Sequence, residues 1–146
     1  MSPRTKEKVF SYFKEAISSL LIDVTTKALL AHAAIKWIST ANPLLEIGSV
    51  IVGPDQRGNG YGTIVTAVAW SLAVDKYPDH QKISFCNDAS LGIFKLLGAI
   101  EAKKDQLPSE VWDGCLSCPR KIEADKAGKI CCDIVVILPN SGPKRI

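Results

Sequence analysis

A glycine-rich segment between two apolar runs constrains the fold of this chain more than any other feature. Residues 53–63 read GPDQRGNGYGT, directly after the apolar run 44–52 and before a second apolar run, 64–70. This order predicts a strand, a tight loop and a helix. Glycine has no Cβ, so the loop backbone can approach a bound anion, and the first turn of the helix adds unpaired N–H groups and the positive end of the helix dipole. The segment therefore predicts a phosphate-binding cradle.

Two common phosphate-binding loops fit this segment poorly. A P-loop would need lysine and then serine or threonine where Asn59 and Gly60 stand. A dinucleotide-binding loop would need a third glycine at Thr63. Its acidic residue, expected about 20 positions further on, would be Asp79, which lies in a Pro-Asp-His sequence. Neither loop is therefore favoured.

A third pattern, [Q/R]-x-x-G-x-[G/A], is met in full by residues 57–62, RGNGYG. With Val52 and Pro54 before it, this segment resembles the pyrophosphate loop of the GNAT superfamily, the acetyl-CoA-dependent N-acetyltransferases. One loop alone is a weak signal, so the resemblance depends on a further match downstream.

That match lies in residues 87–99, NDASLGIFKLLGA, which follow the strand-like residues 82–86. GNAT members carry a similar block, with a strand that ends in Asn, a short helix and a Leu-Gly sequence. The residues that fit are Asn87, Ser90, Leu97 and Gly98. The separation between the two blocks suits one helix and one strand, as the family requires.

The resemblance implies a single α/β domain, residues 1–146, with a central mixed β-sheet flanked by helices. It is best over about residues 20–103, and residues 104–146 would add a cysteine-containing C-terminal strand segment. Periodicity and turn signals predict helices at about 3–18 and 63–75, and a third that begins at Asn87 or Asp88 and ends before Gly98. Strands are predicted at 20–25, 28–38, 44–52, 82–86, 100–103 and 130–138, although the alanines of 28–38 suit a helix equally well.

The helix at 63–75 is apolar nearly all round, so we expect it to be buried against the sheet. The order of the elements is the family's order without its usual first strand and helix. The chain is therefore expected to be a short variant or one whose N-terminus is trimmed.

The resemblance also implies which residues bind acetyl-CoA. Backbone N–H groups of Val50, Ile51 and Val52 would hold the pantetheine arm and polarise the acetyl carbonyl. The pyrophosphate would be bound, through amides more than side chains, by Arg57, Gly58, Asn59, Gly60, Tyr61, Gly62 and Thr63. Asn87 and Phe94 in the second block complete the predicted cofactor-binding set.

Glu46 is the candidate general base, because it interrupts an apolar strand in the register where lysine-modifying family members carry a catalytic glutamate. A carboxylate among apolar residues loses solvation, which raises its pKa toward a useful range. Strict strand alternation also allows a solvated, non-catalytic Glu46. His32, on the neighbouring strand, could relay a proton through water, but a lone histidine in an apolar run is more often structural.

Phe94 stands where the family commonly has a tyrosine that protonates the leaving thiolate. Three readings follow. The thiolate leaves unassisted, since a thiol pKa near 8–9 makes it a tolerable leaving group; or Cys86 or Tyr61 serves as donor; or the chain binds acetyl-CoA without efficient turnover. We favour the first.

The remaining cysteines leave three alternatives open. Cys115 and Cys118 form a C-x-x-C pair, and Cys131 and Cys132 are adjacent. Four thiols are compatible with zinc or with a regulatory disulfide, but adjacent cysteines on a strand point to opposite faces. Ordinary reduced thiols are favoured, and no metal site is predicted.

Composition narrows the function class only broadly. The 146 residues are 47% hydrophobic and 23% charged with a net charge of +3, which is too small to argue for nucleic-acid binding. No apolar run approaches a membrane span and the N-terminus has no signal-peptide core, so a cytoplasmic location without membrane attachment is expected. The predicted function is acetyl transfer from acetyl-CoA to an amine, on a small molecule or a protein, with a homodimer left open. The competing function is a non-catalytic acyl-CoA-binding or sensor module.

Overall fold

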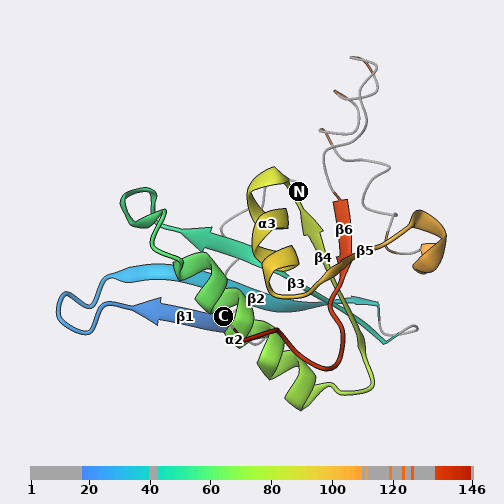
Figure 1. Cartoon of the computed structure of the whole chain (residues 1–146), viewed down its shortest axis with the longest axis horizontal. Helices are drawn as coiled ribbons and strands as arrows, with labels where there is room; N and C mark the ends of the chain where they lie inside the picture. The colour runs from blue at the N-terminus through green and yellow to red at the C-terminus, as the bar shows by residue number, and fades with distance from the viewer. Residues whose placement is uncertain are drawn as a thin grey trace.

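The computed structural model describes residues 18–39, 43–109, 111, 119, 123, 126 and 134–145. These residues form a six-stranded sheet in the order β1-β2-β3-β4-β6-β5 (Figure 1). The strands are β1 (Ser18–Ile22), β2 (Leu29–Ser39), β3 (Leu44–Val52), β4 (Gln81–Cys86), β5 (Ile100–Glu101) and β6 (Ile134–Ile137). The helices are α2 (Tyr61–Lys76) and α3 (Asp88–Leu96), with short 3₁₀ turns η1 (Pro54–Gln56) and η2 (Lys104–Gln106). The expected mixed sheet flanked by helices is confirmed.

The sheet divides between β3 and β4, the parallel pair among its strands. β1, β2 and β3 are antiparallel, and so are β4, β6 and β5. β3 and β4 are parallel, which requires a crossover connection, and α2 supplies it. They pair only from Leu44↔Gln81 to Glu46↔Ile83. Beyond that point the two strands diverge, and Figure 1 shows their arrowheads pointing apart.

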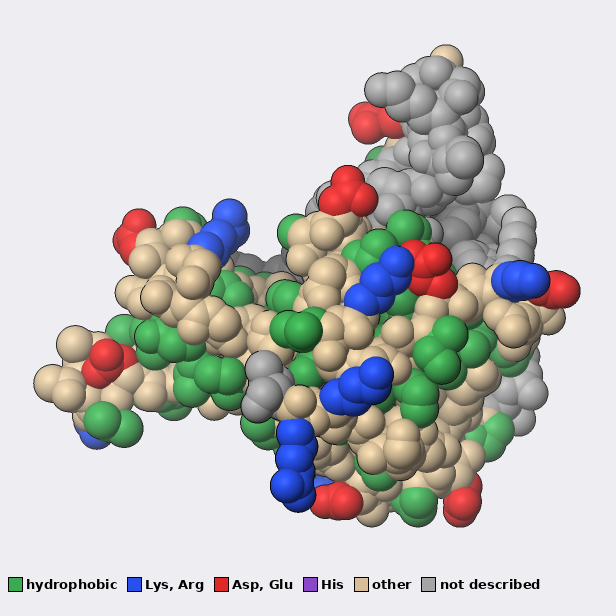
Figure 2. All heavy atoms as spheres, in the orientation of Figure 1, with side chains coloured by type: hydrophobic (Ala, Val, Ile, Leu, Met, Phe, Trp, Pro, Cys, Tyr) green, Lys and Arg blue, Asp and Glu red, His purple; other side chains and the backbone are tan. Residues whose placement is uncertain are grey.

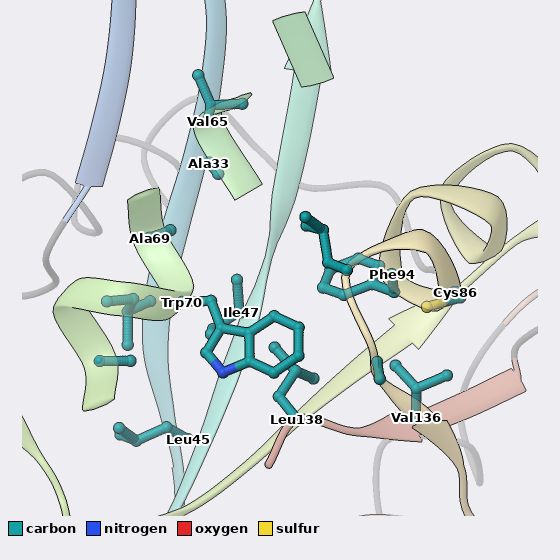
Figure 3. Close-up of a cluster of buried hydrophobic side chains, with 14 of the residues drawn as sticks. Ala33, Leu45, Ile47, Val65, Ala69, Trp70, Cys86, Phe94, Val136 and Leu138 are labelled. Carbon is teal, nitrogen blue, oxygen red and sulfur yellow. The ribbon is translucent and has the colours of Figure 1, made fainter. Parts of the chain in front are cut away.

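The main core lies between the sheet and helix α2. Small residues of β2, such as Ala31 and Ala33, let the helix approach the sheet closely. Trp70 is the largest buried side chain of the helix, and its Nε1 donates to the carbonyl oxygen of Pro139 at 3.1 Å. Figure 3 shows Trp70 and Phe94 meeting side chains of β3 and β6 in this core.

A second, smaller cluster lies on the opposite face of the sheet. It contains Leu44, Ile83, Leu107, Val111 and Val135. Neighbouring residues of a strand face opposite sides, so Leu45 packs in the main core while Leu44 packs here. Glu46 and Gly48 alternate with Leu45 and Ile47, which places them on the same face as Leu44.

Most predicted element boundaries hold to within a few residues. The strand at 44–52 is confirmed in full, the alanine-rich segment 28–38 is a strand and not a helix, and α3 has Asn87 as its N-cap. The strand expected at 20–25 runs instead from Ser18 to Ile22, because Asp23 starts a turn by accepting from the N–H groups of Thr25 and Thr26 at 2.8 and 2.9 Å. The strand expected at 100–103 is shorter than predicted and comprises Ile100–Glu101. Within the strand expected at 130–138, the structure describes β6, Ile134–Ile137. The helix predicted at 3–18, apart from Ser18, and the four C-terminal cysteines lie outside the described residues.

The helix expected at 63–75 is buried against the sheet, as predicted, but not on all sides. Ile64 and Val68 of α2 are 43% and 46% exposed, because the helix covers the sheet with one side only. Hydrophobic side chains are also exposed on the antiparallel pair of β1 and β2 (Figure 2), among them Leu20, Ile22 and Leu29. Within the described part of the chain, no helix has the length and apolar character needed to cross a bilayer.

Candidate active site

The divergence of β3 from β4 opens a cavity of about 700 Å³. Its walls come from four segments that are distant in the sequence. They are Gly48–Val52 of β3; Gln56, Arg57, Gly58, Gly60, Tyr61, Gly62 and Thr63 of the loop and the first turn of α2; Ser84 and Phe85 of β4; and Asn87, Ala89, Ser90, Ile93 and Phe94 at α3. The fold thus brings all but one of the predicted cofactor-binding residues to one cavity.

The exception is Asn59, which does not line the cavity. Its Nδ2 donates to the carbonyl oxygen of Gln56 at 3.0 Å, so this side chain stabilises the loop from outside. The loop owes its shape to Gly58 and Gly60, whose φ angles of +84° and +79° lie in the left-handed region that favours glycine.

The first turn of α2 faces the cavity. Gly60 is its N-cap and no side chain caps it, and the first backbone bond of the helix runs from the Ile64 N–H to the Gly60 carbonyl at 3.1 Å. The preceding N–H groups, of Tyr61, Gly62 and Thr63, have no partner within the helix. Unpaired N–H groups at the positive end of a helix dipole are the kind of donors that bind anions in proteins.

Glycine is needed at position 62 because of the side chains packed around it, and not because of its φ angle. A Cβ at this position would lie 3.1 Å from Ile93 Cδ1 and 3.3 Å from Val52 Cγ2. The first turn of α2 is therefore wedged between β3 and α3, and only glycine fits there without a shift.

β3 carries a bulge where it lines the cavity. His32 pairs with Ile51 and Ala34 pairs with Gly48, so one residue of β2 faces two residues of β3, Ser49 and Val50. Ser49 has a φ of +52°, which is uncommon for a residue with a side chain. A bulge bends a strand and increases its twist, which is consistent with the divergence of β3 from β4. The bulge was not predicted, and its only signal in the sequence is the Gly-Ser pair at 48–49 between apolar residues.

His32 contacts the bulge from the neighbouring strand. The residue is 4% exposed, and its Nδ1 lies 3.1 Å from the carbonyl oxygen of Ser49. Burial lowers the pKa of His32, and the contact with the Ser49 carbonyl opposes this in part. Neither His32 nor any of its atoms lines the cavity, which does not favour the proton relay considered for it.

Glu46 is buried, contrary to the alternative in which it is a solvated strand residue. It is 1% exposed, and its Oε2 lies 2.6 Å from Nζ of Lys36, its cross-strand neighbour. Glu46 does not line the cavity, but Gly48 does. A Cβ at residue 48 would lie 2.7 Å from Glu46 Oε1, so the carboxylate occupies the space beside Gly48 at the cavity wall.

At the α3 side, Asn87 and Ser90 form a capping box. Ser90 N–H donates to Asn87 Oδ1 at 2.9 Å, and Asn87 N–H donates to Ser90 Oγ at 3.1 Å. The side-chain oxygen of Asn87 thus stabilises the start of α3. This fixes the helix that forms one cavity wall.

Phe94 is 1% exposed and belongs to both the core and the cavity wall. Cys86 packs in the same core with no exposed surface and does not line the cavity, whereas Tyr61 does (Figure 3). Ser84 also lines the cavity, one residue beyond the last β3–β4 pair, and it was not among the predicted site residues.

Comparison with known proteins agrees with this geometry. The profile of the acetyltransferase (GNAT) family matches residues 2–99, more than half of the chain. No curated protein sequence matches the chain significantly.

Solved structures of the same fold include N-acetylglutamate synthase from Neisseria gonorrhoeae in complex with coenzyme A and N-acetyl-glutamate. It is 20% identical with a TM-score of 0.60, and the similarity covers 92% of this chain but only 28% of that one. A chimera of spermidine N-acetyltransferase from Vibrio cholerae is 13% identical with a TM-score of 0.60, covering 93% of this chain and 75% of that one. GCN5 from Tetrahymena is 12% identical with a TM-score of 0.59, covering 93% and 78%. At these identities the likeness concerns the fold, and the family profile shows that this chain belongs to the acetyltransferase (GNAT) family.

Proposed function

We propose that this chain transfers an acetyl group from acetyl-CoA to an amine by direct attack of the amine on the thioester. The observation that carries the proposal is the cavity between β3 and β4, which has a glycine-rich anion cradle at one end and a free strand edge along its side. A long cofactor with a pyrophosphate and an amide-containing arm fits both features.

The cradle would bind the pyrophosphate. The first-turn N–H groups of α2, from Tyr61 to Thr63, would donate to its oxygens, and Gly58 and Gly60 give the loop the curvature that brings these groups together. Arg57 lines the cavity and is exposed, so its guanidinium would add positive charge at the mouth.

The pantetheine arm would lie along β3. No residue of β4 pairs with β3 beyond Glu46, so among the described residues the polar backbone groups of Val50–Val52 on that edge have no strand partner. N–H groups there would donate to the arm and to the acetyl carbonyl, whose oxygen gains negative charge during attack.

Glu46 would be the general base. An amine is largely protonated at neutral pH, and the Glu46 carboxylate, which lies beside the wall residue Gly48, would remove its proton before attack. The 2.6 Å contact with Lys36 fixes the carboxylate beside Gly48. Glu46→Gln should lower kcat/KM by about 10²–10⁴-fold with little change in acetyl-CoA affinity.

The thiolate would leave without a proton from residue 94, since phenylalanine cannot donate one. Phe94 also supports the competing function, an acyl-CoA-binding module that does not turn over. The neighbours' names suggest a small amine acceptor such as glutamate or spermidine, and an amine on a protein is the other class of acceptor that we propose to test. Cytoplasmic location and homodimerisation belong to this proposal too, and are checked by cell fractionation and light scattering.

One experiment separates transferase from binding module. Release of free CoA is followed with acetyl-CoA and a panel of amines that includes glutamate, spermidine and a lysine peptide, while calorimetry measures acetyl-CoA binding. Binding together with amine-dependent CoA release is expected. Binding without release from any amine would favour the module, and no binding would overturn both functions.

A further inference from the structure

We propose that His32 is a positioning residue, which holds the β3 bulge in the conformation that presents backbone N–H groups to the acyl end of the cofactor. This inference rests on the proposed function. His32 itself would touch neither cofactor nor acceptor, because it does not line the cavity.

The first observation is the contact between His32 and the bulge. Nδ1 of His32 lies 3.1 Å from the carbonyl oxygen of Ser49. A carbonyl oxygen can only accept, so Nδ1 must carry the hydrogen. Burial lowers the pKa of His32, which favours the neutral ring at neutral pH, and a neutral imidazole has a single N–H. That N–H is committed to Ser49.

The second observation is that the bulge needs support. Ser49 has a φ of +52°, a conformation that a residue with a side chain adopts only where surrounding contacts impose it. Its carbonyl points toward β2, and the ring of His32, a residue that is 4% exposed, meets it there. His32 lies between Ala31 and Ala33 on β2, which belong to the main core with α2, so its side chain is on the opposite face of the strand.

The third observation is the place of the bulge in the cavity. Gly48, Ser49, Val50, Ile51 and Val52 all line the cavity. The orientation of one peptide group in this run fixes the orientation of the next. A change at the Ser49 carbonyl would therefore redirect the N–H of Val50, which is joined to it in the same peptide plane.

The chemistry of the side chain offers a matched set of variants. Asparagine carries its N–H₂ near the place of histidine Nδ1, whereas glutamine carries it near the place of Nε2. His32→Asn should preserve the bond to Ser49. His32→Gln and His32→Leu should lose it, although leucine still fills the apolar part of the site. His80→Asn, at the far end of α2, is the control for loss of a histidine.

Calorimetry with acetyl-CoA, and with a nucleotide fragment of CoA that keeps the pyrophosphate but lacks the pantetheine arm, gives the first readout. In His32→Gln and His32→Leu we expect acetyl-CoA to bind at least about fivefold more weakly, while affinity for the fragment stays within about twofold of wild type. His32→Asn and His80→Asn should match wild type for both ligands. Because these measurements need no turnover, they stand even if the chain proves not to be a transferase.

Initial rates give the second readout. With saturating acetyl-CoA, kcat should fall about tenfold or more in His32→Gln and His32→Leu and stay within about threefold of wild type in His32→Asn. Unchanged acetyl-CoA affinity in His32→Leu would overturn the inference. So would equal losses in the Asn and Gln variants, or a parallel loss of fragment binding, because a merely structural histidine would weaken the whole site. A wild-type chain that binds acetyl-CoA but never releases CoA would refute the proposed function alone.

Discussion

Gly48→Ala displaces the carboxylate of Glu46 without changing its chemistry. A Cβ at residue 48 lies 2.7 Å from Glu46 Oε1 and 3.3 Å from its carboxyl carbon. Non-bonded heavy atoms ordinarily rest about 3.5 Å apart, so the carboxylate must withdraw by roughly 0.8 Å. Since Glu46 is buried and its other oxygen lies 2.6 Å from Lys36 Nζ, the withdrawal also disturbs this ion pair.

The size of the expected loss follows from this displacement. A reacting group misplaced by about 1 Å can cost on the order of 10²-fold in rate. We therefore expect kcat to fall by about 10- to 100-fold in Gly48→Ala, measured as amine-dependent release of CoA. Affinity for acetyl-CoA, measured by calorimetry, should change little because the three atoms nearest the added Cβ all belong to Glu46, and none belongs to the bulge or to the cradle at α2.

Two controls sharpen this prediction. Gly92→Ala in α3 adds the same methyl where no atom lies within 4 Å, so its activity should equal that of wild type. Gly48→Ala in a Glu46→Gln background should cost no further activity, because the two changes act through one carboxylate. The reasoning is refuted if Gly48→Ala keeps wild-type kcat, or if it lowers kcat equally with and without Glu46.

Three further predictions concern other parts of the site. Gly62→Val should abolish acetyl-CoA binding in calorimetry. Even a Cβ at residue 62 lies 3.1 Å from Ile93 Cδ1, so a larger side chain must push the first turn of α2 away. Retained affinity would show that the cradle does not bind the cofactor. Phe94→Tyr should raise kcat by less than about tenfold if thiolate departure is not rate-limiting, whereas strong rescue of an inactive wild type would favour the binding module. Burial lowers the pKa of His32 below its ordinary 6.5, so the unfolded chain takes up more protons as pH falls through that value and stability falls with it. The drop in Tm between pH 8 and pH 5.5 should therefore shrink in His32→Leu, and an unchanged drop would assign the pH dependence to other groups.

The sequence predicts the cradle well because its determinants are local. Glycine at positions 58 and 60 permits the left-handed turns, and the apolar runs on either side fix a strand before the loop and a helix after it. The same local chemistry predicts a helix capped by Asn87 or Asp88, and the structure has Asn87 as the N-cap of α3. Each of these features depends on residues within a few positions of one another.

Features that depend on cross-strand register were not predictable in this way. The bulge at Ser49 exists because β2 and β3 slip by one residue between His32 and Ala34, and neither strand alone shows it. The burial of Glu46 likewise depends on Lys36 of the neighbouring strand β2 and on residues that cover the face of the sheet opposite α2. For α2, an apolar sequence on all sides could not tell which side would remain exposed.

The cavity lies where β3 lacks hydrogen bonds to β4, and this indicates the kind of ligand that fits it. β3 is nine residues long, yet it pairs with β4 over three positions only, and its bulge lies in the part where that pairing has ended. Buried backbone N–H and C=O groups almost always find partners, so an edge left open inside a cavity calls for a ligand that can supply them. A ligand that binds a strand edge must offer donors and acceptors along its length, as an added strand does. The pantetheine arm has two amide groups at such a spacing, and a pyrophosphate at one end of it would reach the cradle at α2. Strand edge and cradle would thus bind one molecule at both ends of the same cavity, which is why loss of either should affect acetyl-CoA while only loss of the cradle should affect its nucleotide fragment.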